Sequence, residues 1–411
     1  MRVLHLVKTA DGASWAADQA AELVKLGVEI HVALPRAHGR AVKKWSDGGA
    51  VIHILPTDIP VRTPWGTIAA AKQLAALVGT VKPDLLHSHF FGSTVLLRMA
   101  LGKKHGIPRI FQVPGPLHLE HRLWRQLELS SAGSNDFWVG SSQCIVRHYR
   151  AAGVARNRLY LSYYGLPLSD CQTARTGELR RRYGIPDHFK VIGNANFMYP
   201  PKWYLGQSVG LKAHEDVIDA LGIVTRQRSD VVGVLIGGSS IASAGYENSL
   251  RRRARKVDGD RILLTGYVPV EEIRRMWPDF DIAVHVPTSE NCGGVGEPML
   301  AGVPTIAGRV GGLPEVVLDG VTGSLVPIRQ PEELARAIIR VLDAPEHSRA
   351  LAKAGQQLMR RMTSLDRIGH EMLAIYKHIL GHVSEPPRFF HPVETLEPAA
   401  AGAWEFRDSA F

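Results

Sequence analysis

The chain has few cysteines and no long apolar run. Its 411 residues include only three cysteines, and no pair of them has CxxC spacing (Cys144, Cys171 and Cys292). This count argues against a disulfide framework and a zinc ribbon, and it fits a reducing compartment. No apolar stretch approaches the ~18 residues that a membrane-spanning helix needs. Met1–Val7 is interrupted by His5 and lacks the features of a signal peptide. We therefore expect a cytoplasmic protein.

Several common catalytic motifs are also absent. The sequence contains no P-loop, no nucleotide-binding GxGxxG and no HExxH spacing. These absences argue against a P-loop nucleotide triphosphatase, a dinucleotide-dependent dehydrogenase and a zinc metalloprotease.

Acidic residues are scarce in the first half of the chain. Residues 1–190 hold 25 Lys and Arg against 13 Asp and Glu, whereas residues 191–411 hold 24 against 26. The net charge of +10 therefore comes from the first half. A basic half attracts anionic partners such as phosphorylated substrates or lipid headgroups, although a merely soluble basic surface is equally compatible.

The length and the apolar pattern predict two domains. A chain of 411 residues is too long for one hydrophobic core. Short apolar strands alternate with helical stretches in two series, which predicts an α/β protein with two doubly wound parallel sheets. We expect domains at 1–188 and 189–362, with 363–411 returning to the first, and a binding site in the cleft between them. The expected strands are Val3–Val7, Glu29–Leu34, Val51–Leu55, Leu85–Ser88, Arg109–Val113 and Phe137–Gly140, and then Lys190–Ile192, Val231–Ile236, Arg261–Thr265, Ile282–Val286 and Thr305–Ala307.

The segment 287–326 carries the strongest chemical signal. A glycine-rich loop with Gly293 and Gly294 follows a predicted strand and precedes a helix that starts near Glu297. Glycines allow backbone amides to approach a ligand, and a helix N-terminus favours an anion such as a diphosphate. Glu290 and Glu297 flank the loop, and carboxylates accept hydrogen bonds from the diol of a sugar. The alternative is a glycine-rich turn in which Glu297 is only a helix-start charge.

This segment resembles the donor site of retaining glycosyltransferases with the GT-B fold, specifically the large family 4. The match runs in order through the residues that define that site: Ser289, Glu290, Gly293, Glu297, Gly302-Val303-Pro304-Thr305-Ile306-Ala307, Gly311-Gly312-Leu313-Pro314-Glu315, Asp319-Gly320, Gly323 and Leu325-Val326. It departs in one respect, because Glu290 and Glu297 are seven residues apart instead of the family's eight. The resemblance implies two Rossmann-like domains that face each other across a cleft.

The resemblance also implies a role for each residue of this segment. Glu297 is expected to bind the ribose hydroxyls of the nucleotide, and Glu290 is expected to lie beside the donor sugar as a catalytic residue. The amides of Gly293 and Gly294 are expected to contact the sugar or the phosphates. Gly237 matches the glycine turn that follows the family's next strand, and Val268 lies in the segment that contacts the nucleobase.

The family has a second donor element, Gly-Arg followed by Lys-Gly, whose two cations neutralise the diphosphate. No arginine follows Gly193 here. Lys212 matches the family lysine by its position before a helix and is expected to be catalytic, and Lys202 is a candidate for the second charge. A solvated lysine is the alternative for both.

The first domain resembles the family less closely. Gly12 matches a glycine-rich loop that closes over the donor phosphates, and His87 and His89 match a pair of histidines that we interpret as structural. Pro114 stands where the family has a histidine. His118 is therefore the candidate that takes over the polar and catalytic role of that histidine near the acceptor. A histidine in the first turn of a helix is the alternative for His118.

The function implied is transfer of a sugar from a nucleoside diphosphate sugar, with UDP preferred to GDP, to a hydroxyl of a lipid-linked saccharide or another glycan. Such enzymes balance the diphosphate without a metal, so Asp279-Phe280-Asp281, which spells the DxD of a different class, is expected to be a polar loop. No cofactor and no nucleic acid are expected, whereas peripheral contact with an anionic membrane is. The alternatives are an epimerase or phosphorylase of the same fold, and a sugar-nucleotide-binding protein without activity.

Overall fold

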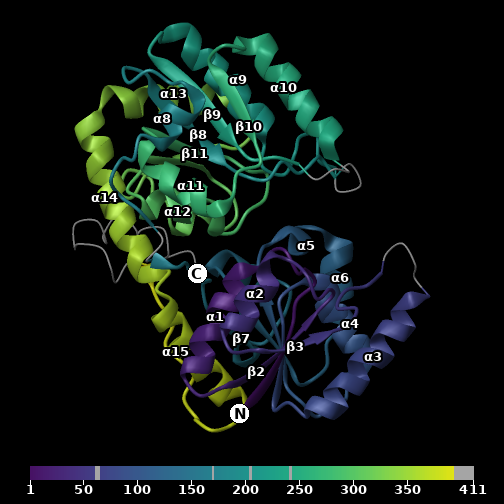
Figure 1. Cartoon of the computed structure of the whole chain (residues 1–411). Coiled ribbons are helices and arrows are strands. Elements are labelled where there is room, and N and C mark those ends of the chain that lie inside the picture. The colour runs from purple at the N-terminus through teal and green to yellow at the C-terminus, as the bar shows by residue number, and fades with distance from the viewer. Residues whose placement is uncertain (61–64, 169–170, 203–205, 240–242, 393–411) are drawn as a thin grey trace. The chain divides into compact units, whose positions relative to one another are not determined.

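A computed structural model describes residues 1–60, 65–168, 171–202, 206–239 and 243–392. The described chain divides into two compact units (Figure 1). In the described part of the chain, unit 1 comprises Met1–Pro167 and Thr363–Phe390, and unit 2 comprises Leu168–Met362 together with His391 and Pro392. Of the C-terminal segment 363–411 that was expected to join the first domain, residues 393–411 lie outside the described part of the chain.

Unit 1 is built on a seven-stranded parallel sheet in the order β3-β2-β1-β4-β5-β6-β7. The strands are β1 (Arg2–Leu6), β2 (Glu29–Leu34), β3 (Val51–Ile54), β4 (Leu85–Ser88), β5 (Arg109–Val113), β6 (Asp136–Gly140) and β7 (Leu159–Leu161). The helices are α1 (Ser14–Lys25), α2 (Arg40–Asp47), α3 (Gly66–Val81), α4 (Phe91–Leu101), α5 (Leu117–Glu120), α6 (Arg122–Ser131), α7 (Gln143–Ala151) and α15 (Leu365–Ile379).

Helix α15 returns from the far end of the sequence and packs beside α1 (Figure 1). Met372, Ile375 and Tyr376 belong to the same buried cluster as Ala16 and Leu23. The apolar face of α15 therefore completes the core of unit 1.

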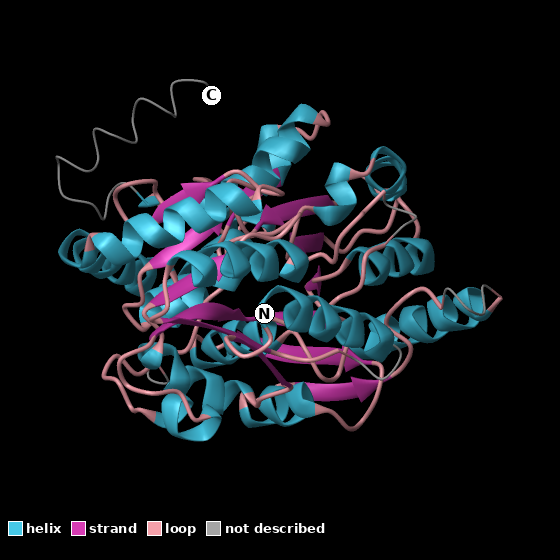
Figure 2. Ribbon diagram, turned by 90° about the horizontal axis from the view of Figure 1, so that it is seen from above, coloured by secondary structure: helices cyan, strands magenta, loops and turns pink. Residues whose placement is uncertain are grey.

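Unit 2 repeats the same plan with a six-stranded parallel sheet in the order β10-β9-β8-β11-β12-β13. The strands are β8 (Lys190–Ala195), β9 (Val231–Ile236), β10 (Ile262–Gly266), β11 (Ile282–His285), β12 (Thr305–Gly308) and β13 (Ser324–Val326). The helices are α8 (Glu178–Tyr183), α9 (His214–Gln227), α10 (Ala244–Asp258), α11 (Val270–Met276), α12 (Gly296–Leu300), α13 (Pro331–Asp343) and α14 (Pro345–Met362). Figure 2 shows the strands of both sheets flanked by helices.

The predicted fold class is confirmed, since both sheets are parallel and are layered with helices as two apolar strand series require. The short strands β7 and β13 were not among the expected strands. Helix α1 begins at Ser14, and its cap position is Ala13, which has a left-handed backbone conformation.

The division between the units falls after Pro167, not after residue 188 as expected. The physical reason is Asp279, whose carboxylate accepts hydrogen bonds from the backbone N–H groups of Thr176 (2.8 Å), Gly177 (2.8 Å) and Leu179 (3.0 Å). These bonds satisfy the free amides at the start of α8 and attach that helix to unit 2.

Asp281, the other acid of the DxD sequence, is also engaged by the backbone. It accepts a 2.8 Å hydrogen bond from the N–H of Val191 and pairs with Arg175 at 2.7 Å. Both carboxylates of Asp279-Phe280-Asp281 therefore have structural partners, in agreement with the expected polar loop.

Candidate donor-binding site

The candidate site of unit 2 lies where strands β8 and β11 end. These strands are neighbours in a parallel sheet, so the loops that follow them emerge at the same edge. Asn196 follows β8, His285 ends β11, and the loop after β11 carries Glu290. The same loop is tied to the segment before α9, because the N–H of Thr288 donates to the carbonyl oxygen of Leu211 at 3.0 Å.

Glu290 is the centre of this cluster. Its Oε2 accepts from the Nζ of Lys212 in an ion pair and from the Nε2 of His285 at 2.9 Å. Its Oε1 accepts from the N–H of Asn291 at 3.0 Å. Burial alone would raise the pKa of Glu290, but the charge of Lys212 and the bond from His285 outweigh it and hold the pKa well below its ordinary value. Glu290 is therefore an ionised carboxylate that can only accept hydrogen bonds.

The structure thus brings together Lys212 and Glu290, which the sequence places 78 residues apart. Lys212 precedes α9, whose cap residue Ala213 has a left-handed backbone. Lys202 lies earlier in the same connection, where its own N–H donates to Gln207 Oε1 at 3.0 Å. Its role as the second phosphate-binding charge stays a prediction.

His285 and Asn196 were missed by the sequence analysis. The Nδ1 of His285 lies 3.3 Å from the Nδ2 of Asn196, and the imidazole is 3% exposed. Burial lowers the pKa of His285, and Lys212 lowers it further, against the opposing effect of Glu290, so the ring is neutral near pH 7. The available signal was a histidine at the end of the apolar strand Ile282–His285, directly before the functional loop.

Glu297 lies in the first turn of α12, as expected. Its Oε1 pairs with the Nε of Arg274 at 3.0 Å, and its Oε2 accepts from the indole N–H of Trp277 at 3.4 Å. The side chain is 23% exposed and can meet a ligand. Helix α12 has only five residues, so its dipole contributes less to anion binding than the sequence suggested.

The glycines of the loop allow close backbone contacts. Gly293 and Gly294 form a short 3-10 turn that leads into α12. Gly311 has a φ of +57°, and a Cβ there would overlap the carbonyl oxygen of Glu290. The turn Gly311-Gly312 therefore fixes the backbone of Glu290, which also accepts a 3.3 Å hydrogen bond from the N–H of Gly312.

Gly237 follows strand β9, and Val268, in the segment expected to contact the nucleobase, follows strand β10. Gly237 has a φ of +136°, and a Cβ there would overlap the carbonyl oxygen of Asn196, so only glycine fits. Val268 is 3% exposed and packs in the core of unit 2. The side chain of Val268 is therefore not available to a nucleobase. A contact between Val268 and a nucleobase would have to be made by its backbone.

His118 and Gly12 belong to unit 1. Gly12 lies in the loop between β1 and α1, where its N–H donates to Thr9 Oγ1 at 3.3 Å. His118 lies on α5, and its Nε2 is 3.3 Å from the hydroxyl of Tyr149. Burial first, and then the charge of Arg98, lower the pKa of His118 to about 3. His118 is therefore a neutral hydrogen-bonding group near pH 7.

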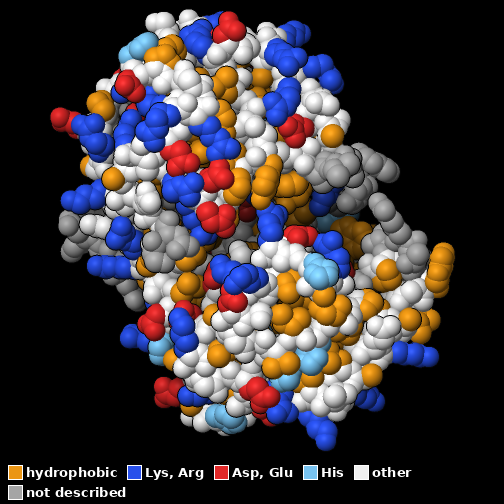
Figure 3. Space-filling view, in the orientation of Figure 1, with side chains coloured by type: hydrophobic (Ala, Val, Ile, Leu, Met, Phe, Trp, Pro, Cys, Tyr) orange, Lys and Arg blue, Asp and Glu red, His pale blue; other side chains and the backbone are white. Residues whose placement is uncertain are grey.

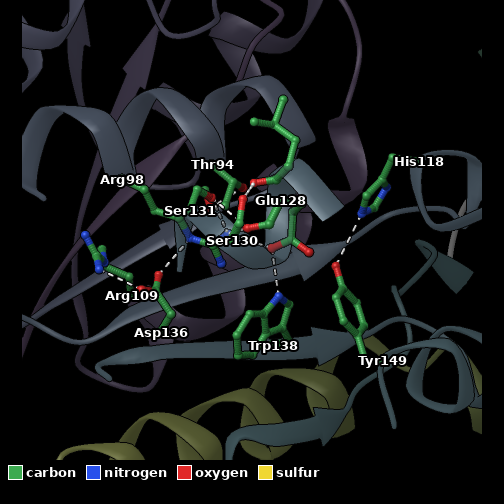
Figure 4. A network of polar contacts seen from close by, with 12 residues as sticks. Thr94, Arg98, Arg109, His118, Glu128, Ser130, Ser131, Asp136, Trp138 and Tyr149 are labelled. Atoms are coloured by element: carbon green, nitrogen blue, oxygen red, sulfur yellow. Dashed lines mark hydrogen bonds and ion pairs between the residues drawn. The ribbon is translucent and has the colours of Figure 1, made fainter. Parts of the chain in front are cut away.

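A buried ion network lies beside His118 and Tyr149 (Figure 4). Arg98 donates to Glu128 at 2.6 Å and to Asp136 at 2.9 Å, and Arg109 donates to Asp136 at 2.6 Å. All four side chains are 2% exposed or less. The network joins α4, α6, β5 and β6, so its contribution is structural.

One group in the described part of the chain has donor atoms spaced for a metal: the buried histidines His5, His87 and His89, with ring nitrogens within 4.8 Å of one another. Three of these nitrogens already have partners, because the Nδ1 of His5 lies 3.0 Å from the Nε2 of His89 and the Nδ1 of His87 lies 2.6 Å from the hydroxyl of Tyr376. The rings of His87 and His89 are stacked, with an interplanar angle of 28°. The arrangement supports the structural interpretation, which ties β1 and β4 to α15.

These histidines predict an acid-sensitive unit 1. Burial lowers the pKa of His5 to about 3 and keeps the pKa values of His87 and His89 well below the usual 6.5. Below pH 6.5 the unfolded chain binds protons that the folded chain does not, so stability falls as the pH falls. Each such histidine contributes about 1.4 kcal/mol per pH unit. Urea unfolding at pH 7.5, 6.5 and 5.5 measures this, and a midpoint that is constant across this range would contradict it.

Comparison with known proteins shows which families and relatives this chain resembles. The family model "Glycosyl transferases group 1" matches residues 202–358, and "Glycosyl transferase 4-like domain" matches residues 12–165. Among curated relatives, alpha-D-kanosaminyltransferase of Streptomyces kanamyceticus is 31% identical over 207 residues, which are 50% of each chain. D-inositol 3-phosphate glycosyltransferase of Segniliparus rotundus is 29% identical over 153 residues, 37% of this chain and 34% of the relative. The matched part thus spans half or less of these relatives.

Solved structures match over a greater length. HepE of Anabaena, in complex with UDP and glucose, has a TM-score of 0.76 at 18% identity, covering 91% of this chain and 98% of HepE. Sucrose-phosphate synthase of Thermosynechococcus elongatus has a TM-score of 0.75 at 17% identity, covering 93% and 100%. At this identity the likeness shows the fold, which is GT-B.

Proposed function

Because the chain belongs to the group 1 glycosyl transferases and has the GT-B fold, we propose that it is a retaining, metal-independent enzyme that transfers a sugar from a nucleoside diphosphate sugar to a hydroxyl group. The observation that carries this proposal is the cluster of Lys212, His285 and ionised Glu290 at one edge of the sheet of unit 2. A cation beside a carboxylate suits a ligand that combines a diphosphate with a polyhydroxylated sugar.

The chemistry follows from the charges. Bond cleavage at the sugar places negative charge on the departing diphosphate, and Lys212 and backbone amides stabilise that charge. Glu290 is ionised and cannot protonate the leaving group, so it accepts a hydrogen bond from a sugar hydroxyl. In a front-face mechanism the departing phosphate takes the acceptor's proton, and the configuration is retained. The structural engagement of Asp279 and Asp281 supports a diphosphate that is balanced without a DxD-bound metal.

For the donor we propose a UDP-sugar, in line with the HepE structures, which are complexes with UDP and glucose and with UDP-glucose. For the acceptor we propose a hydroxyl of a lipid-linked saccharide or another glycan. The names of relatives support a second class, a soluble cyclitol: two of them are D-inositol 3-phosphate glycosyltransferase and 2-deoxystreptamine glucosyltransferase.

Released nucleoside diphosphate tests the proposal. The protein is incubated with UDP-, GDP- and dTDP-sugars, together with a lipid extract, inositol phosphates or 2-deoxystreptamine. We expect release from one donor that depends on an acceptor. Glu297→Ala should lower kcat/KM for the donor about tenfold to a hundredfold, because it removes charge-assisted hydrogen bonds to the ribose.

Glu346→Ala, an exposed glutamate in the first turn of another helix, α14, is the matched control and should leave kcat/KM unchanged. Conversion of the donor without an acceptor would favour an epimerase, since the structure of a UDP-N-acetylglucosamine 2-epimerase matches this chain with a TM-score of 0.63. Nucleotide binding with no release from any donor would favour the non-catalytic alternative.

We also propose that unit 1 docks on anionic lipid. None of the helices in the described residues has the length and apolarity that crossing a membrane requires. However, Trp65 is 77% exposed and Leu123 is 66% exposed, and the visible face of unit 1 carries hydrophobic side chains among Lys and Arg (Figure 3). We expect sedimentation with anionic vesicles at low salt and release at high salt. Equal recovery in the supernatant with neutral and anionic vesicles would overturn this.

A further inference from the structure

His285 occupies a position from which it can hold Glu290 in place. The imidazole lies between two side chains, with Nδ1 3.3 Å from Asn196 Nδ2 and Nε2 2.9 Å from Glu290 Oε2. The ring ends strand β11 and is 3% exposed, so its position is set by the sheet and not by solvent. Each of its two nitrogens therefore has one polar partner.

The charges of the partners decide the tautomer of His285. An ionised carboxylate only accepts, so the nitrogen that faces Glu290 must carry the proton. A neutral imidazole has one N–H, which leaves Nδ1 as the acceptor for the amide of Asn196. The chain of donors therefore runs from Asn196 to His285 to Glu290.

Lys212 lies where it can pair with two anions, the carboxylate of Glu290 and the diphosphate of a donor. In the ligand-free protein it pairs with Glu290, so one positive charge is balanced by one negative charge. A diphosphate brings further negative charge, and Lys212 can stabilise it only by sharing or leaving the carboxylate. Without another donor, Glu290 would then lose most of its compensation in a buried site. Among the described residues, His285 and the N–H of Asn291 then remain to hold it, on different oxygens.

The loop geometry agrees with a fixed imidazole. A Cβ at position 294 would overlap the Nε2 and Cε1 atoms of His285, so the backbone of Gly294 lies directly on the ring. A rigid ring thus fixes the glycine loop as well as the carboxylate. Gly294 is required here for contact with His285, in addition to any contact with a ligand.

We propose that His285 is a positioning residue of the donor site: it donates from Nε2 to Glu290 and keeps this carboxylate oriented towards the donor sugar while Lys212 turns to the diphosphate. The proposal rests on the function proposed above. Asn196 supports this role, because its amide N–H donates to the Nδ1 of His285 and so favours the tautomer with the proton on Nε2. The sugar part of the donor, and not the nucleotide part, is the moiety that depends on His285.

Two substitutions separate this role from a packing role. His285→Leu fills the space without a donor, whereas in His285→Gln the amide N–H can donate from about the position of Nε2. His347→Leu, at an exposed position of α14, is the control. We expect His285→Leu to lower kcat about tenfold to a hundredfold and to weaken binding of UDP-glucose more than binding of UDP in calorimetry. His285→Gln should recover most of both, and all variants should unfold at similar temperatures.

Equal losses in the Leu and Gln variants, or equal losses of affinity for UDP and UDP-glucose, would overturn the proposal. A second readout does not need turnover: nuclear magnetic resonance of 15N-labelled histidine, with His285 identified by its absence in His285→Gln. We expect a protonated Nε2 and an unprotonated Nδ1, before and after UDP is added. The opposite tautomer would overturn the proposal, even if the wild-type protein transferred no sugar, whereas absence of transfer with the expected tautomer would count against the proposed function only.

Discussion

Lys212→Ala is expected to reduce transfer by about a hundredfold to a thousandfold, the loss typical when one charge-stabilising donor is removed from a transition state. Two effects combine. The departing diphosphate would lose the cation that we propose stabilises it, and Glu290 would lose the partner that holds its pKa low. The carboxylate keeps the 2.9 Å bond from His285, so the site should stay folded while it loses activity. Rates with saturating donor, together with UDP affinity by calorimetry, measure both effects.

Two controls define the role of Lys212. Lys212→Arg keeps the charge in a different geometry and should retain more activity than Lys212→Ala. Lys256→Ala removes an exposed lysine of α10 and should change neither rate nor affinity. If Lys212→Ala kept UDP affinity and rate within about threefold of the wild type, Lys212 would serve only as the ion-pair partner of Glu290, and the diphosphate would need another cation.

Much of the architecture could be predicted from the sequence because buried parallel strands appear as short runs of apolar residues. The strand expected at 29–34 and its counterpart at 231–236 match β2 and β9. Strands β7 and β13 have three residues each, which is too short for a pattern to emerge. The division between the units was misplaced because it depends on Asp279, which binds amides about 100 residues away.

The candidate site was predicted in part. The glycine loop and the resemblance drew attention to Glu290, Glu297 and Lys212, but neither shows which side chains touch. That Lys212 pairs with Glu290, and Glu297 with Arg274, follows from the sheet edge and from helix placement. His285 was missed because it is the last residue of an apolar strand, and the sequence pattern does not distinguish it from the other buried residues of that strand. Only the fold places its ring between Asn196 and the carboxylate.

The sequence also does not show which residues form the buried ion network of unit 1. The substitution with the largest expected effect on stability lies in this network. Asp136 accepts from Arg98 at 2.9 Å, from Arg109 at 2.6 Å and from the N–H of Gly133 at 2.6 Å. Burial opposes the charge on Arg98, but Glu128 and Asp136 outweigh it and raise the pKa of the guanidinium. Arg98 therefore stays charged, and both buried arginines depend on a carboxylate that solvent cannot replace.

Asp136→Ala should accordingly destabilise unit 1 by about 3–5 kcal/mol, because it leaves two buried guanidinium groups short of their counter-charge. In a unit of this size that lowers the unfolding midpoint by about 10 °C. Asp47→Ala is the matched control: its pair with Lys43 is 60% and 83% exposed, so the expected change is below about 0.5 kcal/mol. Calorimetry of the whole chain should show one transition moving and the other, from unit 2, staying in place. A shift of both transitions, or equal shifts for Asp136→Ala and Asp47→Ala, would show that the network does not stabilise unit 1 in this way.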